Sequence, residues 1–329
     1  MKALHIRNHK HGRLMPRWGT PAGLVATAAR NLGYTITKDN NLVWAGEPVN
    51  TIESHTSAGV NLYTDCTIDD VGYGDSLFLG MSGPLPGYFT LDKLGVWPWI
   101  EPTYKQIDLD LVDLDNYPHD LINSIKEQKK TLFHSKIINK GHDSPEPEDL
   151  PDDHILILVS HMDNQWKDGW AMFGNVVSRL KWGDMDYPVV IKFDPRLTHG
   201  HDGMPDKHKQ EQHKPMMDSL KGIKGVTIYT GAESLHDILP KTRACIMDEC
   251  TQFLEPFMYE VPIITYSAPP YHRAVKKIEH QHELIPALHD ISWYSKDLSN
   301  RWLTWYLTNY VCYDQESTTR RVKELLDVV

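Results

Sequence analysis

The sequence contains 329 residues, which is long for one ordinary hydrophobic core and suits two domains of roughly 150 residues each. Hydrophobic residues make up 40% and charged residues 24% of the chain, an ordinary balance for a globular protein. The formal net charge of −10 argues against extended non-specific binding to nucleic acid or to an anionic membrane. We expect a cytoplasmic protein, because no run approaches the roughly 18 apolar residues of a membrane span and the N-terminus is too polar for a signal peptide.

The cysteines and histidines do not form a recognisable metal or disulfide pattern. The four cysteines contain no CxxC pair, which argues against a disulfide framework and against structural zinc. HGHD at residues 199–202 is the segment that could hold a metal, and we favour a solvated loop there. We therefore predict no metal site and leave a divalent cation open.

The first predicted strand, residues 2–7, leads into a long basic loop and then a helix over residues 24–32. Long loops at the carboxyl ends of strands often carry function, although a solvated surface loop is the alternative here. The imidazole and guanidinium groups of the loop are those of His9, His11, Arg13 and Arg17. We predict that His9, Arg13 and Arg17 bind an acceptor or a phosphate. We regard His11 as a candidate general base.

A buried strand is predicted at residues 77–79 (LFL), followed by a cluster of glycines and prolines. Asp75 precedes it and is the second candidate general base, unless it only caps a turn. Further on, the acidic residues 141–153 contain several helix breakers and form the best predicted boundary. We expect an N-terminal domain at residues 1–145, a C-terminal domain at 146–290, and C-terminal helices at 291–329 that pack back on the domains.

The second half alternates short apolar strands with helices, which predicts a parallel sheet whose ligands bind at the carboxyl ends of the strands. The predicted strands are residues 155–159, 189–192, 226–229, 244–247 and 262–265. Polar residues stand at or just after their carboxyl ends, namely Ser160, His161, Lys192, Asp194, Arg196, Tyr229, Glu249 and Thr251. We predict that they bind a phosphorylated ligand such as a nucleotide, with surface charge as the alternative for Lys192 and Arg196.

The order of these segments resembles the capsule-polysaccharide Kdo-transferase family over about residues 75–310. The segments are SGPLPGYFTLDKLGVWP, SKIINK, LPDDHILILVSHMDN, VVIKFDPR and the long stretch from VTIYTGAESLHDILP to VPIITYSAPPY. The resemblance implies an α/β glycosyltransferase of the two-domain B fold (GT-B), in which two Rossmann-like domains face a cleft and a helical tail follows. It also implies a UDP-, GDP- or CMP-sugar donor held mainly by the second domain.

The resemblance assigns roles to single residues. In the family, a lysine-proline-histidine-proline strand end and a later serine pair bind the donor phosphate, and a glutamate follows on a helix. Lys192 matches the lysine, and Glu255 matches the glutamate, which implies a ribose contact. Asp194 replaces the histidine, and Thr251 alone keeps a hydroxyl where the serines stand. An aspartate beside the donor phosphate costs on the order of a kcal/mol without a cation, which argues against CMP-Kdo as the donor.

The acceptor is open between two classes. A glycan follows from the resemblance, whereas a hydroxymethylated DNA base is the substrate of phage glucosyltransferases that share the B fold. The basic first loop permits DNA, and the net charge of −10 argues against it. The alternative to an enzyme is a non-catalytic nucleotide- or sugar-binding module. We expect no cofactor besides the nucleotide-sugar, and a location in the cytoplasm of a bacterial cell or a phage-infected host.

Overall fold

The computed structural model describes residues 3–9, 20–43, 60–64, 76–80, 84–94, 107–134, 146–159, 176–179, 186–193, 214–215, 217–229, 233–247, 253–265 and 273–326. Contacts divide the chain into two compact units, which are described separately. Unit 1 comprises Met1–Asp113 together with Thr304–Val329, and unit 2 comprises Leu114–Leu303.

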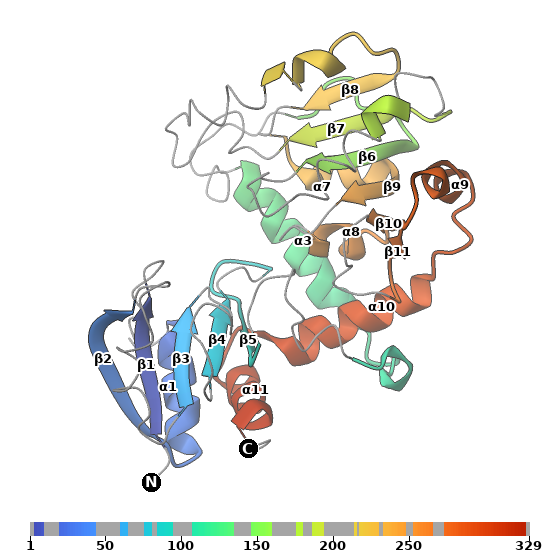
Figure 1. Cartoon of the computed structure of the whole chain (residues 1–329). Helices are drawn as coiled ribbons and strands as arrows, with labels where there is room; N and C mark the ends of the chain where they lie inside the picture. Colours follow the sequence, from blue (N-terminus) through green and yellow to red (C-terminus); the bar gives the residue numbers. More distant parts are fainter. Residues whose placement is uncertain are drawn as a thin grey trace. The chain divides into compact units, whose positions relative to one another are not determined.

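Unit 1 contains a six-stranded sheet with the order β12-β5-β4-β3-β1-β2 (Figure 1). The strands are β1 (Ala3–His9), β2 (Thr35–Val43), β3 (Val60–Thr64), β4 (Ser76–Gly80), β5 (Phe89–Asp92) and β12 (Val311–Cys312). β1 to β4 are mutually parallel, whereas β5 is antiparallel to both β4 and β12. The strand order reverses between β1 and β3, so the topological switch point of this sheet lies where β1 and β3 end.

Two helices complete the core of unit 1. α1 (Pro21–Asn31) begins at the cap Thr20, whose hydroxyl accepts a hydrogen bond from the Gly23 amide at 3.2 Å. α11 (Gln315–Leu326) packs against α1 and contributes Val322 to the same buried cluster as the strand residues. α11, close to the C-terminus, therefore belongs to the same unit as the N-terminal strands.

Unit 2 contains a second six-stranded sheet, with the order β11-β10-β9-β6-β7-β8 (Figure 1). Its strands are β6 (His154–Val159), β7 (Val189–Phe193), β8 (Val226–Tyr229), β9 (Thr242–Met247), β10 (Ile263–Thr265) and β11 (Lys276–Lys277). All neighbouring pairs are parallel. Counted along the chain, this is the doubly wound order 3-2-1-4-5-6 of dinucleotide-binding folds, with its switch point between β6 and β9.

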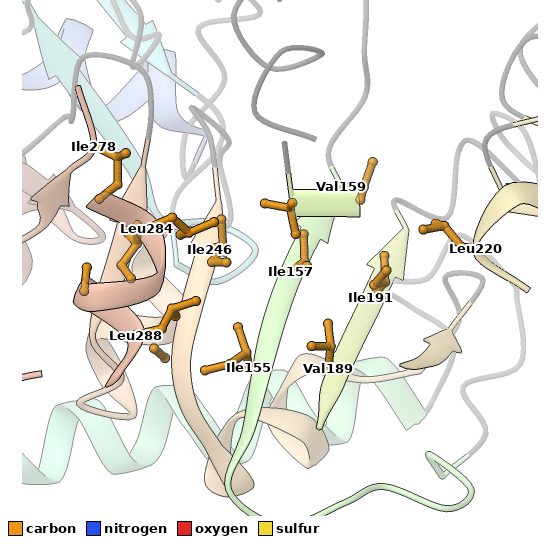
Figure 2. Close-up of a cluster of buried hydrophobic side chains, with 14 of the residues drawn as sticks. Ile155, Ile157, Val159, Val189, Ile191, Leu220, Ile246, Ile278, Leu284 and Leu288 are labelled. Carbon is orange, nitrogen blue, oxygen red and sulfur yellow. The ribbon is translucent and has the colours of Figure 1, made fainter. Parts of the chain in front are cut away.

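Helices cover this sheet and explain why its strands are apolar on both faces. They are α3 (His119–His134), α7 (Leu235–Ile238), α8 (Leu254–Met258), α9 (Leu284–His289) and α10 (Lys296–Trp305). Figure 2 shows a hydrophobic core of unit 2, in which Ile155, Ile157 and Ile191 point to the face that Leu284 and Leu288 of α9 cover. All six residues of β6 are buried, as expected for the central strand.

The fold class expected from the sequence is confirmed as α/β with Rossmann-like units and C-terminal helices. The chain passes from one unit to the other after residues 113 and 303, which differs from the expected domain ranges 1–145, 146–290 and 291–329. The difference arises because α3 packs on α7 and pairs with α8, and so belongs to unit 2. As folding domains, the three ranges stay a prediction. In the part of the chain that is described, no helix has the length and hydrophobicity needed to cross a membrane.

Candidate functional site

The site predicted from the sequence begins at the switch point of unit 2. β6 ends at Val159 and β9 at Met247, and the two strands are parallel neighbours with Leu158 opposite Met247. The segments that follow these two ends therefore leave the sheet from adjacent points. Ser160, His161, Glu249 and Thr251 belong to those segments and lie outside the described residues.

Lys192 lies one strand away, in β7, and is only 4% exposed. Its neighbours in the strand, Ile191 and Phe193, belong to the core of Figure 2, so strand alternation places Lys192 on the opposite face of the sheet. It pairs in register with Leu158 of β6 and Tyr229 of β8, close to the carboxyl edge. A phosphate contact through Lys192 stays a prediction, as do those of Asp194 and Arg196, which lie outside the described residues.

Tyr229 is the last residue of β8, and its hydroxyl already has a partner. The phenol donates a hydrogen bond of 2.6 Å to the carbonyl oxygen of Glu148. Burial, together with nearby acidic groups of which Glu233 is the strongest, raises the pKa of Tyr229 to about 12. The phenol is therefore neutral at ordinary pH and ties residues 146–150 to the sheet. A ligand contact by Tyr229 stays a prediction. Such a contact would use the aromatic ring or the lone pairs of the hydroxyl oxygen.

Glu255 is the second residue of α8, the helix that follows β9, and it is 5% exposed. Its Oε1 forms an ion pair with Nζ of Lys129 on α3. Its Oε2 is buried and has no hydrogen-bond partner among the described residues. A buried acceptor without a partner costs about 1–3 kcal/mol, and more when it is charged. This oxygen thus has unused acceptor capacity, and its contact with the hydroxyl groups of a ligand stays a prediction.

Helix α3 carries two further lysines, Lys126 and Lys130, which contact other residues of unit 2. Lys130 pairs with Asp237 of α7 at 2.8 Å, and Nζ of Lys126 lies 4.6 Å from the ring centre of Tyr259. His236 of α7 lies with Nδ1 3.0 Å from the Tyr259 hydroxyl. Burial, together with the three lysines of which Lys129 is the strongest, lowers the pKa of His236 to about 3. His236 is therefore neutral at pH 7 and is unsuited to act as a cationic ligand for phosphate.

The three lysines of α3 are not among the residues predicted from the sequence. Lys126, Lys129 and Lys130 have the i, i+3, i+4 spacing that places side chains on one face of a helix, and this signal is present in the sequence. Their partners are not visible there, because Asp237 and Glu255 follow more than one hundred residues later.

In unit 1, the predicted acceptor residues follow the switch point between β1 and β3. His9 is the last residue of β1. His11, Arg13 and Arg17 come next and lie outside the described residues, as does Asp75.

The two candidate bases adjoin different edges of the unit 1 sheet. Ser76, which follows Asp75, is the first residue of β4 and pairs with Asn61 of β3. It lies at the amino edge of the parallel strands, opposite the edge where β1 ends. His11 is therefore the better placed of the two, in chain position, for a base acting at the carboxyl edge.

Unit 2 also has a cavity of about 200 Å³ near the amino end of β10, the edge opposite the predicted donor residues. Its lining is mostly polar and consists of Tyr117, His119, Ile122, Asn123, Lys126, Met258, Tyr259 and Glu260. Burial lowers the pKa of Lys126, although the nearby Glu260 raises it. Within the described ranges, no three histidine, cysteine or acidic side chains are grouped to hold a metal ion. The HGHD segment lies outside those ranges.

The fold and the two switch points define an α/β protein with two Rossmann-like units. No family model matches the sequence, and no curated protein matches it. Among solved structures, the chain is similar to a β-Kdo 2,7 transferase, KpsC of Thermosulfurimonas dismutans, with a TM-score of 0.49 and 12% identity over 99% of both chains. It is also similar to the UDP-GlcNAc 2-epimerase of Methanocaldococcus jannaschii, with a TM-score of 0.43 and 11% identity over 100% of both chains.

A glycosyltransferase of Rickettsia africae is a third similar structure, with a TM-score of 0.41 and 10% identity over 100% of this chain and 99% of the other. A Kdo transferase, the class that the sequence motifs resemble, is thus among these structures. At such low identities the similarity concerns the fold, and no activity follows from it.

Proposed function

We propose that this protein is a glycosyltransferase that transfers a sugar from a nucleotide-sugar donor to an acceptor hydroxyl of a glycan or of a hydroxymethylated DNA base. The observation that carries the proposal is the switch point of unit 2. Predicted ligand residues follow the adjacent ends of β6 and β9 there, and the next helix carries Glu255 with a buried, unused carboxylate oxygen. Doubly wound sheets bind nucleotides at this position.

The residues of unit 2 have distinct roles in donor binding. Oε2 of Glu255 accepts hydrogen bonds from the ribose hydroxyls, while Lys129 neutralises the carboxylate through Oε1. Lys192 and Arg196 contact the phosphate, and Thr251 donates its hydroxyl to it. The charge of Lys192 is weakly screened because the residue is 4% exposed. The donor is a UDP-, GDP- or CMP-sugar.

The chemistry is substitution at the anomeric carbon. The acceptor oxygen forms a bond to that carbon, the bond from the carbon to the phosphate oxygen breaks, and the nucleotide leaves with the bonding electron pair. Lys192 and Arg196 stabilise the negative charge that develops on the leaving phosphate. In an inverting enzyme His11 takes the proton of the attacking hydroxyl, which must be removed as the new bond forms.

A thermal-shift screen of UDP, GDP, CMP and their sugar conjugates tests donor binding, and sugar transfer to glycans and to hydroxymethylated DNA tests turnover. We expect one nucleotide base to stabilise the protein. Glu255→Gln should weaken that nucleotide about 10- to 100-fold, since hydrogen bonds to charged groups contribute roughly 1.5–3 kcal/mol. The control is Glu279→Gln, an exposed glutamate paired with Lys277, which should leave nucleotide affinity unchanged.

Three outcomes contradict the proposal in different ways. If no nucleotide stabilises the protein, unit 2 is not a donor site. If nucleotides bind and no acceptor is glycosylated, the protein is the non-catalytic binding module. If a nucleotide-sugar is isomerised without an acceptor, the protein is an enzyme of another class.

A further inference from the structure

A stacked pair of tyrosines lies at the carboxyl edge of the unit 1 sheet. Gly80, the last residue of β4, pairs with Thr90, so the start of the antiparallel β5 extends beyond the end of β4. Cys312 of β12 pairs with Phe89 of β5, and Tyr88 and Tyr313 are the next residues outward. Their ring centroids are 5.1 Å apart and the ring planes differ by 27°. Because β4 is parallel to β3 and β1, this is also the edge at which β1 ends.

The pair is both open and fixed in place. Tyr313 remains 42% exposed although its ring stacks with that of Tyr88. The Tyr313 amide donates to Oγ of Ser317 at 3.1 Å. The Tyr88 amide donates to the Leu85 carbonyl at 3.0 Å, closing a turn in which Gly87 has φ +89°. A pre-positioned tyrosine binds with a small loss of side-chain entropy.

We propose that Tyr88 and Tyr313 form a platform on which a sugar ring of a glycan acceptor stacks; this inference rests on the proposed glycosyltransferase function. The apolar face of a sugar ring matches an aromatic face, and the two phenols can exchange hydrogen bonds with its hydroxyls. The charge beside the platform favours a glycan over DNA. Asp314 follows Tyr313 directly and interacts with the Tyr88 phenol, and Arg320 interacts with Asp314, so this pair of charges offers no net positive charge to a phosphodiester backbone.

The position of the platform defines its role. In the strand order, β5 and β12 lie three and four places from β1. At about 4.8 Å per strand, the tyrosines are roughly 14–19 Å from the end of β1. The platform is therefore a distal acceptor subsite. Its loss should raise KM for long acceptors and leave kcat and the KM for the donor unchanged.

The test uses the full chain on a printed glycan array, and a hydroxymethylcytosine-containing DNA duplex as the competing probe. We expect the wild type to bind glycans and Tyr313→Ala to reduce that binding about tenfold, since aromatic stacking with its buried area contributes roughly 1–2 kcal/mol. Tyr313→Phe keeps the ring and should retain most of the binding. Leu111→Ala removes another exposed apolar side chain of unit 1, which is 82% exposed, and should have no effect. If Tyr313→Ala unfolds, Tyr88→Ala provides the same comparison.

Three results overturn the platform. In the first, both tyrosine variants bind glycans as well as the wild type does. In the second, the wild type binds no glycan. In the third, the wild type binds the DNA duplex and Tyr313→Ala weakens that binding. The nucleotide screen separates this inference from the proposed function. Nucleotide stabilisation and sugar transfer that persist in Tyr313→Ala with an unchanged acceptor KM refute the platform alone, whereas the absence of nucleotide binding refutes the proposed function.

Discussion

Replacing Lys129 by methionine tests the ion pair on which the candidate donor site depends. Lys129→Met keeps an unbranched side chain as far as Cε and removes the ammonium group, so the Glu255 carboxylate loses its cation. The side chains of Lys129 and Glu255 are 12% and 7% exposed, so water reaches neither freely. Removing one partner of a buried ion pair typically costs about 3–5 kcal/mol, because the other charge stays buried without compensation.

The double variant Lys129→Met/Glu255→Gln separates this charge effect from packing. It removes both charges, so we expect it to recover stability relative to Lys129→Met, with a coupling energy of about 1–3 kcal/mol. The matched control is Lys221→Met, which breaks the Lys221–Asp218 pair on the surface of the same unit, where the side chains are 70% and 46% exposed. Its stability should be almost unchanged, because solvent screens that pair.

Two buried thiols allow each unit to be followed separately. Cys245 lies in β9 of unit 2 and Cys312 in β12 of unit 1, and both are 0% exposed. Alkylation of each, measured by mass spectrometry, therefore requires opening of its own unit. Lys129→Met should accelerate labelling of Cys245 by roughly two to three and a half orders of magnitude, and labelling of Cys312 far less. Equal rates of Cys245 labelling in Lys129→Met and Lys221→Met would refute a stabilising role of the buried Lys129–Glu255 pair.

Two further predictions concern buried polar groups. With a folded pKa of about 3 for His236, only the unfolded state binds a proton between about pH 6.5 and 3, so stability falls as the pH drops through that window. Lowering the pH from 7 to 5 should cost about 2 kcal/mol through this residue. That part of the pH dependence should vanish in His236→Phe and persist in His282→Asn, an exposed control; equal pH slopes in the two variants would contradict it. In unit 1, the Tyr310 hydroxyl donates to the buried Oδ2 of Asp92 at 2.9 Å. Tyr310→Phe should lower the stability of unit 1 by about 1–3 kcal/mol, measured by the rate of Cys312 labelling. A loss of stability as small as that caused by Leu111→Ala would refute this prediction.

The elements that the sequence predicted well are those whose pattern is local. The apolar run at residues 155–159 became β6, and the runs at 189–192 and 226–229 became β7 and β8 with ends shifted by no more than one residue. We did not predict β3, where apolar and polar residues do not form a clear pattern. α11 falls within the C-terminal helices expected at residues 291–329, but its bounds were not predicted, because its core residues Val322, Leu325 and Leu326 are separated by polar positions. Its burial depends on α1, almost three hundred residues earlier in the chain.

The same distinction applies to the candidate site. Strand ends can be located from the sequence, and the segments with Ser160 and Thr251 do follow adjacent strands. The partner of Glu255 could not be located, because an ion pair with a residue 126 positions away leaves no local pattern. The contacts that place α3 in unit 2 are also distant in the sequence, so the division between the units was expected at the acidic segment near residue 145. α3 joins unit 2 through side chains that looked like an ordinary solvated helix face.

These contacts change how the substitutions at the candidate phosphate site should be judged. Asp194 and Glu249 place acidic side chains where the resembling family has a histidine and serines, which on sequence grounds disfavours a diphosphate. In unit 2, however, Lys129 and Lys130 of α3 pair with the carboxylates of Glu255 and Asp237, while Lys126 lies over the Tyr259 ring and interacts with Glu260. The carboxylate of Glu255 is therefore neutralised before a ligand arrives. In the proposed donor site, Glu255 thus adds no net repulsion to a phosphate, and Lys129→Met should weaken nucleotide binding even in protein that remains folded.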